Sequence, residues 1–298
     1  MIKKTLVTFL ILFCAYTFIV TYVVDPNRVV SEHQWQDNQI KTQRYLFSDN
    51  DSISAIIVGS SLSERLHMNM LPHFYNLGLL GLGAIDGLAT IKAKGNYPKY
   101  IFIETNHIDR PLNDELKNSI ENPLMTPLRR HFISLRDGKQ PLGFIAIPYA
   151  QKATAYGIYL LQVTLSKIIS KQTEQGSEIS VNIFDKMLTQ SIEQQNKIPL
   201  NLDTEINILK KYVEDASRQG STIIFFEMPI QQQLCGLPRP MSIRKEIYKH
   251  FLRNQYRYID IPDCAEYRTT DGEHLDYISA KKYTEYLKKQ IESLGLKF

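Results

Sequence analysis

The sequence predicts an α/β protein, in which a mostly parallel five-stranded sheet is covered by helices on both faces. Short apolar runs of strand type alternate with longer stretches of helical periodicity, and several runs end in glycine or polar residues. Such residues fall at the carboxyl ends of the strands, where parallel sheets bind ligands. We expect an anchor over residues 1–25, a stalk over 26–50, and one domain over 51–298 with an insertion at about 111–200.

The first 25 residues predict a single-pass membrane anchor. Residues 5–24 carry no charge, and twenty residues at about 1.5 Å each span the roughly 30 Å hydrocarbon core. Lys3 and Lys4 precede this run, which places the N-terminus in the cytoplasm and the remainder outside. A cleaved signal peptide is the alternative, but its apolar region is shorter and ends in small residues. Cys14 follows Leu-Phe, which does not fit a lipoprotein site.

The expected elements follow from apolar periodicity and from breakers such as Pro72. Strands are predicted over 53–58, 73–77, 100–104, 222–226 and 256–261. Helices are predicted over 31–45, 61–70, 84–94, 150–170, 183–195, 202–218, 243–254 and 276–294. A long insertion between core units is often a lid or a substrate-recognition element, and we expect one of these roles for residues 111–200.

Composition excludes several classes of protein. The net charge of the 298 residues is only +4 and no long basic run occurs, so nucleic-acid binding is not expected. Cysteine and histidine spacing shows no zinc signature. We therefore expect no metal and no cofactor, and we expect His67, His73 and His107 to be surface or capping residues.

Two cysteines lie outside the anchor. Cys235 and Cys264 are expected on loops that follow the last two strands. In an exported domain such a pair can form a disulfide, which would brace the loop carrying Asp271 and His274. Two unpaired thiols are the alternative.

Two distant segments together predict a serine nucleophile. Gly59 is expected to permit a tight turn after the first strand, because without a Cβ atom it can adopt backbone angles that other residues avoid, and this turn exposes the Ser61 hydroxyl. Taken alone, the Gly-Ser-Ser segment is better explained by Ser60 or Ser61 capping the helix. Asp271 and His274 are three residues apart at a helix entrance, so the carboxylate can orient the imidazole that activates a serine.

Residues 51–106 and 220–292 resemble the SGNH (GDSL-type) hydrolase superfamily, which has a three-layer, flavodoxin-like α/β/α fold. Four blocks carry the resemblance, and they are listed here in chain order: Gly59-Ser-Ser61, Asn76-Leu-Gly-Leu-Leu-Gly81, Glu104-Thr-Asn106 and Asp271-Gly-Glu-His274. Ser60 stands where many members carry aspartate. The third block departs from the usual Gly-x-Asn-Asp pattern.

The resemblance implies a role for each matched residue. Ser61 would be the nucleophile, His274 its base and Asp271 the residue that orients the base. The oxyanion hole would take backbone N–H groups of Ser61 and Gly81, with Gly78 as the alternative to Gly81. The side chain of Asn106 would donate the third N–H.

An anchored, exported domain of this type is similar to accessory proteins of bacterial polysaccharide O-acetylation and of teichoic acid D-alanylation. The resemblance implies an acyltransferase at the bacterial inner membrane, with its catalytic domain in the periplasm. It would move an acyl group, expected to be acetyl, to a cell-envelope polysaccharide. Its expected partner is a membrane-bound O-acyltransferase, and tethering raises the effective concentration of the two proteins. The alternatives are an esterase or deacetylase of acylated glycans, and a non-catalytic scaffold.

Overall fold

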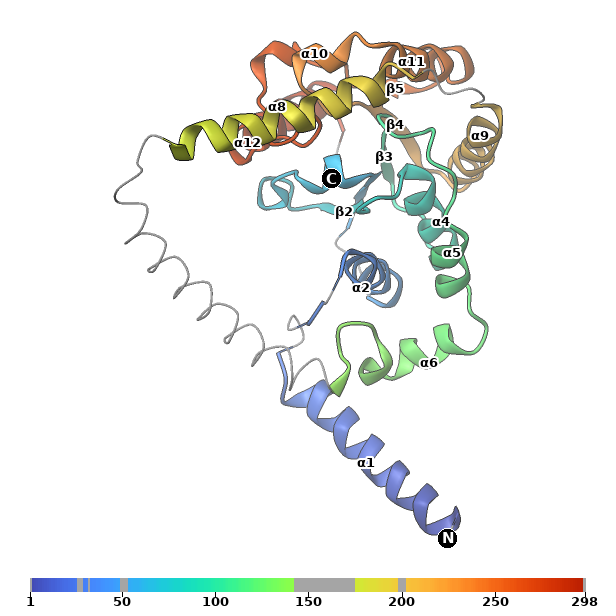
Figure 1. Cartoon of the computed structure of the whole chain (residues 1–298). Helices are drawn as coiled ribbons and strands as arrows, with labels where there is room; N and C mark the ends of the chain where they lie inside the picture. The colour runs from blue at the N-terminus through green and yellow to red at the C-terminus, as the bar shows by residue number, and fades with distance from the viewer. Residues whose placement is uncertain are drawn as a thin grey trace. The chain divides into compact units, whose positions relative to one another are not determined.

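The structure, a computed structural model, describes residues 2–25, 29–31, 33–48, 53–141, 175–197 and 202–296 (Figure 1). The chain divides into two compact units. Unit 1 comprises Met1–Phe47 and Ser119–Glu178, and unit 2 comprises Ser48–Asn118 and Ile179–Phe298. The predicted division into anchor, stalk and one interrupted domain stays a prediction.

Unit 2 contains a five-stranded, all-parallel sheet, which confirms the predicted fold class. The strand order is β2-β1-β3-β4-β5, the flavodoxin-like arrangement. The strands are β1 (Ala55–Gly59), β2 (Phe74–Gly78), β3 (Tyr100–Glu104), β4 (Thr222–Phe226) and β5 (Arg257–Tyr258). The last strand is shorter than the predicted range 256–261. Pro262, which has no N–H to donate, follows soon after the two paired residues.

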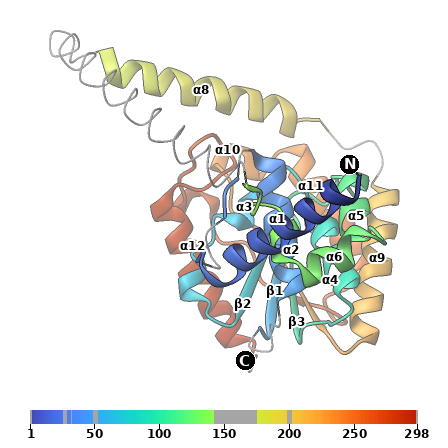
Figure 2. The ribbon, with the colours of Figure 1, turned by 90° about the horizontal axis from the view of Figure 1, so that it is seen from below.

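Helices cover both faces of this sheet (Figures 1 and 2). On one face, side chains such as Ile57 and Phe102 pack in one buried cluster with Tyr283 and Leu287 of α12 (Tyr277–Ser293). The other face is covered by α4 (Ala84–Lys94), α9 (Asp203–Arg218) and α11 (Pro238–His250). Because both faces are covered, β1 and β3 are buried at every position, which explains why their sequences are apolar apart from Glu104 at the end of β3.

Two helices differ from the predicted ranges. The helix predicted over 61–70 is divided into α3 (Ser61–Glu64) and a 3₁₀ turn, η1 (Met68–Met70). Between them the N–H of His67 donates to Thr284 Oγ1 at 3.1 Å, so it is not available for an α-helical bond. Helix α11 begins five residues before the predicted 243, because Pro238 suits the first turn of a helix.

The insertion region is helical where it is described. It contains α5 (Asp114–Ile120), α6 (Met125–His131), the 3₁₀ turn η2 (Ile133–Leu135) and α8 (Gln175–Gln195). Helix α8 includes the predicted range 183–195 and begins earlier. The helix predicted over 150–170 lies outside the described residues.

The N-terminal segment of unit 1 forms α1 (Ile2–Tyr22), followed by α2 (Gln34–Phe47). Helix α1 is long and apolar enough to cross a membrane, a property that anchors share with signal sequences. In unit 2, Cys235 at the end of α10 (Gln232–Cys235) forms a disulfide with Cys264 of η3 (Cys264–Glu266). The apolar helix and the disulfide together indicate an extracytoplasmic domain.

Removing the disulfide is expected to destabilise unit 2. The double variant C235S/C264S removes the cross-link between two residues that are 29 positions apart. The unfolded chain then gains conformational freedom, which typically lowers the free energy of unfolding by about 2–4 kcal/mol. Urea denaturation of the full chain in mild detergent measures this loss. Cys14→Ser, which removes the free cysteine, is the control and should leave the midpoint unchanged. Equal midpoints for the double variant and wild type would contradict the expectation.

Candidate active site

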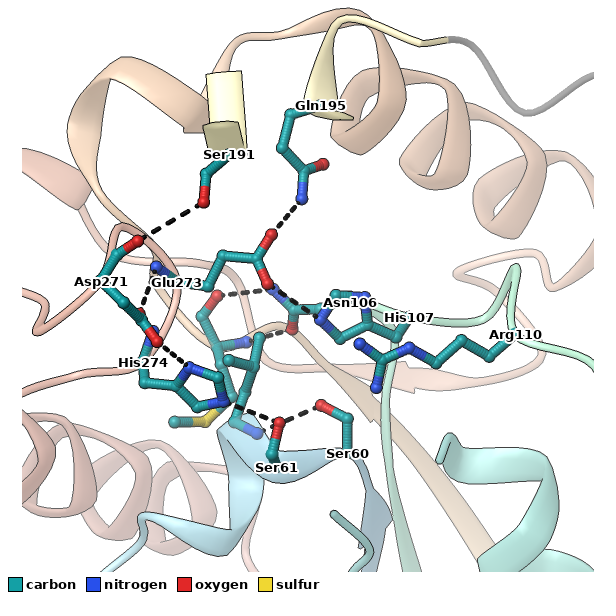
Figure 3. Close-up of polar contacts among 12 residues, drawn as sticks. Ser60, Ser61, Asn106, His107, Arg110, Ser191, Gln195, Asp271, Glu273 and His274 are labelled. Atoms are coloured by element: carbon teal, nitrogen blue, oxygen red, sulfur yellow. Dashed lines mark hydrogen bonds and ion pairs between the residues drawn. The ribbon is translucent and has the colours of Figure 1, made fainter. Parts of the chain in front are cut away.

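Three residues predicted from the sequence form one hydrogen-bonded chain at the carboxyl edge of the sheet (Figure 3). Ser61 Oγ lies 2.7 Å from His274 Nε2, and His274 Nδ1 lies 2.6 Å from Asp271 Oδ2. Ser61 begins α3 directly after β1, whereas the other two residues lie in the loop before α12. The fold therefore brings together side chains that are 213 positions apart in the sequence.

The turn that holds Ser61 depends on close packing at Gly59. The predicted role of this glycine was a special backbone conformation, and that prediction is wrong, because Gly59 is not among the described glycines with positive φ. A Cβ atom at this position would instead lie 2.4 Å from Glu104 Oε2 and 2.4 Å from Ser63 Oγ. Glycine is needed here because the neighbouring strand and helix approach the backbone closely.

The buried carboxylate of Glu104 holds this turn in place. Oε2 accepts the backbone N–H groups of Ser60 at 2.8 Å and of Ser63 at 3.1 Å, and Oε1 accepts the Ser60 hydroxyl at 2.7 Å. Ser60 Oγ in turn accepts the N–H of Leu62 at 3.2 Å, so Ser60 is the helix cap and Ser61 is left to face His274. Glu104 is only 1% exposed, and a buried carboxylate requires such donors.

This role of Glu104 was not predicted from the sequence. A signal was present, since an acidic residue ends a strand that is otherwise apolar. Its donors, however, lie more than forty positions earlier in the chain, and only the pairing of β1 with β3 brings them within reach.

Asp271 orients both the imidazole and the loop that carries it. Its Oδ1 atom accepts the backbone N–H groups of Glu273 at 3.0 Å and of His274 at 2.8 Å, while Oδ2 bonds the His274 ring. Burial acts to raise the pKa of the Asp271 carboxyl, but the hydrogen bonds from His274 and from the two backbone groups outweigh it and lower the pKa to about 2. The carboxylate is therefore ionised at neutral pH.

Gly272 permits the tight conformation of this loop. Its φ is +99°, a region that other residues rarely adopt, and a Cβ atom would lie 3.3 Å from Leu188 of α8. The N–H of Gly272 donates to Thr269 Oγ1 at 3.1 Å, and its carbonyl accepts the N–H of Gln231 at 2.9 Å. Two residues outside the Asp271–His274 segment thus hold Gly272 in place.

The last helix of the insertion region contacts the same loop. Leu188 and Ile192 of α8 pack against the core cluster, and Gln195 Nε2 donates to Glu273 Oε1 at 2.5 Å. The Ser191 hydroxyl approaches the Asp271 carbonyl at 3.4 Å (Figure 3). These contacts place the C-terminal half of α8 beside the Ser61 site, whereas the role of the insertion as a lid or recognition element stays a prediction.

The predicted oxyanion donors follow β1, β2 and β3: Ser61 begins α3, whereas Gly81 and Asn106 lie in loops. Asn106 Nδ2 donates to the Met228 carbonyl at 2.9 Å, and Asn106 Oδ1 accepts the Met228 N–H at 2.8 Å. One N–H of this amide is therefore bonded to the Met228 carbonyl. Gly81, at φ +73°, lies in the turn after β2. The oxyanion roles of Ser61, Gly81 and Asn106 stay predictions.

Asn76, in the second matched block, links the β2 loop to the nucleophile turn. Its Nδ2 atom donates to the Ser63 carbonyl at 2.8 Å, and its Oδ1 atom accepts the N–H of Gly78 at 2.7 Å. The end of β2, which leads into the loop carrying Gly81, is therefore held against the helix that begins at Ser61.

His107 is not a surface or capping residue, so that prediction is wrong. Its side chain is 4% exposed, and neither ring nitrogen has a hydrogen-bond partner among the described residues. Burial, with the charges of Arg110 and Arg239, holds the pKa of His107 well below its usual value. The imidazole is therefore neutral, and its contact with Glu273 at 3.7 Å is not an ion pair. Whether the loop after β3 is buried depends on tertiary packing, which the sequence does not reveal.

A metal centre was not expected. Within the described ranges, no group of three or more histidine, cysteine, aspartate or glutamate side chains is placed to hold a metal ion.

Replacing Glu104 tests its role as the support of the nucleophile turn. Glu104→Ala leaves two buried N–H groups and a hydroxyl without their acceptor, so we expect a loss of about 3 kcal/mol in the free energy of unfolding. Glu104→Gln keeps one oxygen for both N–H groups and should cost only about 1 kcal/mol. Urea denaturation of both variants measures the difference. Equal stability of the two would show that the buried acceptor is unimportant.

The low pKa of Asp271 predicts a pH-dependent contribution to stability. The pKa is about 2 in the folded protein and about 3.9 in an unfolded chain. The stabilisation is therefore complete above about pH 4 and is lost as the pH falls through about 2, by at most about 2 kcal/mol for this partly exposed group. Unfolding of wild type and Asp271→Asn should differ by a constant amount from pH 7 to about pH 4, and by less toward pH 2. A difference independent of pH over the acid range would refute this assignment.

The site geometry gives the three predicted residues a relay arrangement without identifying their substrate. Comparison of the chain with protein-family models, with curated proteins and with solved structures found no match. The chain is thus an α/β protein with an all-parallel five-stranded sheet and a Ser-His-Asp hydrogen-bonded chain at its carboxyl edge.

Proposed function

We propose that the protein is a membrane-anchored, extracytoplasmic serine acyltransferase of SGNH type. Its substrate would be a cell-envelope polysaccharide, which receives an acyl group, most simply acetyl. The observation that carries this proposal is the hydrogen-bonded chain from Ser61 through His274 to Asp271, with distances of 2.7 and 2.6 Å. A serine hydroxyl becomes a useful nucleophile when an oriented imidazole takes its proton.

The reaction would proceed through an acyl-enzyme. His274 Nε2 takes the Ser61 proton as Oγ attacks the carbonyl carbon of the acyl donor, and the proton then passes to the leaving group. In the second half, a glycan hydroxyl attacks the ester, His274 takes the proton of this hydroxyl and returns it to Ser61 Oγ. The ionised Asp271 stabilises the imidazolium that forms in each half-reaction.

The oxyanion would receive N–H groups from the backbone of Ser61, from the backbone of Gly81 and from the side chain of Asn106. The bonds between Asn106 and Met228 support this role, because they fix the plane of the amide. Loss of one such donor costs about 3 kcal/mol of transition-state stabilisation.

The location supports transfer at the cell envelope. Helix α1 would anchor the chain in the bacterial inner membrane, and the Cys235–Cys264 disulfide suits a periplasmic domain. A membrane-bound O-acyltransferase is the proposed partner that supplies the acyl group, since a shared membrane keeps donor and acceptor proteins close.

Labelling with a serine-reactive fluorophosphonate tests the nucleophile. The full chain should be labelled once, at Ser61, and Ser61→Ala should abolish labelling. Ser63→Ala is the matched control, because this serine lies in the same short helix and donates to the Ser60 carbonyl at 3.1 Å. His274→Ala should lower the labelling rate by at least about 10²-fold. Equal labelling of wild type and Ser61→Ala would refute the proposed nucleophile.

Glycan O-acetylation in a deletion strain distinguishes transfer from the alternatives. Less acetylation than in the parent strain supports the transferase, whereas more acetylation supports an esterase that uses water as acceptor. Complementation with Ser61→Ala should fail. Full complementation by this variant would instead favour the non-catalytic scaffold.

A further inference from the structure

Unit 1 contains a cavity of about 120 Å³ at the end of α1. Val20 and Thr21, in the last turn of α1, form part of its wall. Apolar side chains of Val29, Ile40 and Ile133 also line it. The cavity belongs to unit 1 alone and does not include the Ser61 site.

The residues around η2 lie along the second half of α1. The rings of Phe13 and Phe132 are 5.5 Å apart, and Thr17 Oγ1 lies 2.7 Å from Ser134 Oγ. The Tyr16 hydroxyl donates to the Lys139 carbonyl. At about 1.5 Å per residue, Phe13 lies about 10 Å along the helix from Val20. With α1 in a bilayer, Phe132 would thus reach the acyl-chain region while the cavity stays at the level of the headgroups.

The exposed side chains of this segment suit such a position. Leu124 and Phe132 are 67% and 36% exposed, and the last turn of α6 carries Arg129, Arg130 and His131. Exposed apolar side chains beside clustered basic residues are typical of protein segments that lie in a membrane interface.

The cavity itself is lined by three cationic side chains, Arg44, Arg136 and Lys139, and by one carboxylate, Asp137. The Asp137 carboxylate already accepts a hydrogen bond from Gln43 Nε2 at 2.5 Å. It also forms an ion pair with Arg129, which does not line the cavity, at an Nη2–Oδ2 distance of 3.2 Å. Positive charge therefore predominates among the lining side chains.

Two of these cations are partly or wholly buried. Lys139 is only 4% exposed. Arg136 donates to the carbonyls of Arg129 at 2.8 Å and Arg130 at 3.1 Å, which are neutral acceptors. Burial lowers the pKa of Arg136, the effect expected of a desolvated cation, and an anion in the cavity would stabilise it.

We propose that this cavity binds the phosphate group of an anionic phospholipid of the outer leaflet, whose acyl chains lie beside α1 and Phe132. Arg44, Arg136 and Lys139 would contact the phosphate, and the apolar wall would contact the start of the acyl chains. The proposal depends on α1 as a membrane anchor and is independent of chemistry at Ser61. A bound lipid would fix the height of unit 1 at the membrane surface.

Native mass spectrometry of the full chain in detergent tests the proposal, with added phosphatidylglycerol, phosphatidylcholine or inorganic phosphate. We expect one retained phosphatidylglycerol per chain and at least about fivefold less phosphatidylcholine. Arg44→Gln and Arg136→Gln should each lower retention about fivefold, the effect of one basic contact. Arg44 is exposed, so its variant keeps the test valid if Arg136→Gln does not fold. Arg130→Gln, which removes the same charge outside the cavity, should stay within about twofold of wild type.

Three results would overturn the proposal. Equal retention of the two lipids would show that headgroup charge is not recognised. An equal loss in Arg130→Gln would show general attraction by basic residues and no defined site. Displacement of phosphatidylglycerol by millimolar inorganic phosphate would identify the ligand as soluble phosphate. Ser61→Ala should retain lipid as wild type does, so failure of this inference and failure of the proposed catalysis are distinguishable.

Discussion

The buried carboxylate of Glu104 is the contact on which the geometry of the candidate site depends. It joins the carboxyl ends of β1 and β3 by accepting two backbone N–H groups and one hydroxyl from the turn that holds Ser61. A buried negative charge is costly unless donors surround it, so the turn and the carboxylate stabilise each other. The absence of a side chain at Gly59 is part of the same arrangement, because the carboxylate occupies the space that a Cβ atom would need.

Several hydrogen bonds and packing contacts fix the loop that carries Asp271 and His274. Asp271 bonds the His274 ring and two backbone N–H groups, so one carboxylate sets both the imidazole and the loop. Gly272 allows α8 to pack against that loop, and Gln195 bonds Glu273 beside it. The insertion region thus contributes to the order of the candidate site. A movement of α8 would therefore alter the position of the loop that carries the imidazole.

The two proposals concern different units and depend on different kinds of interaction. In unit 2, the proposed acyl transfer depends on hydrogen-bonding groups that the fold already positions at the edge of the sheet. In unit 1, the proposed lipid site depends on buried positive charge close to an apolar helix, where electrostatic attraction and apolar contact act together. The neutral His107 has a role in neither proposal. It is buried in the loop that follows β3, and this burial keeps it uncharged.

The sequence by itself determined the fold class, the positions of the strands along the chain and the three residues of the hydrogen-bonded chain. These follow from local patterns, since buried parallel strands are continuously apolar and a three-residue offset lets Asp271 reach His274. Tertiary structure alone decided the partners of Glu104, the steric role of Gly59, the burial of His107 and the pairing of Cys235 with Cys264. Each of these depends on the distance between side chains that lie far apart in the chain, and packing sets that distance where local periodicity does not.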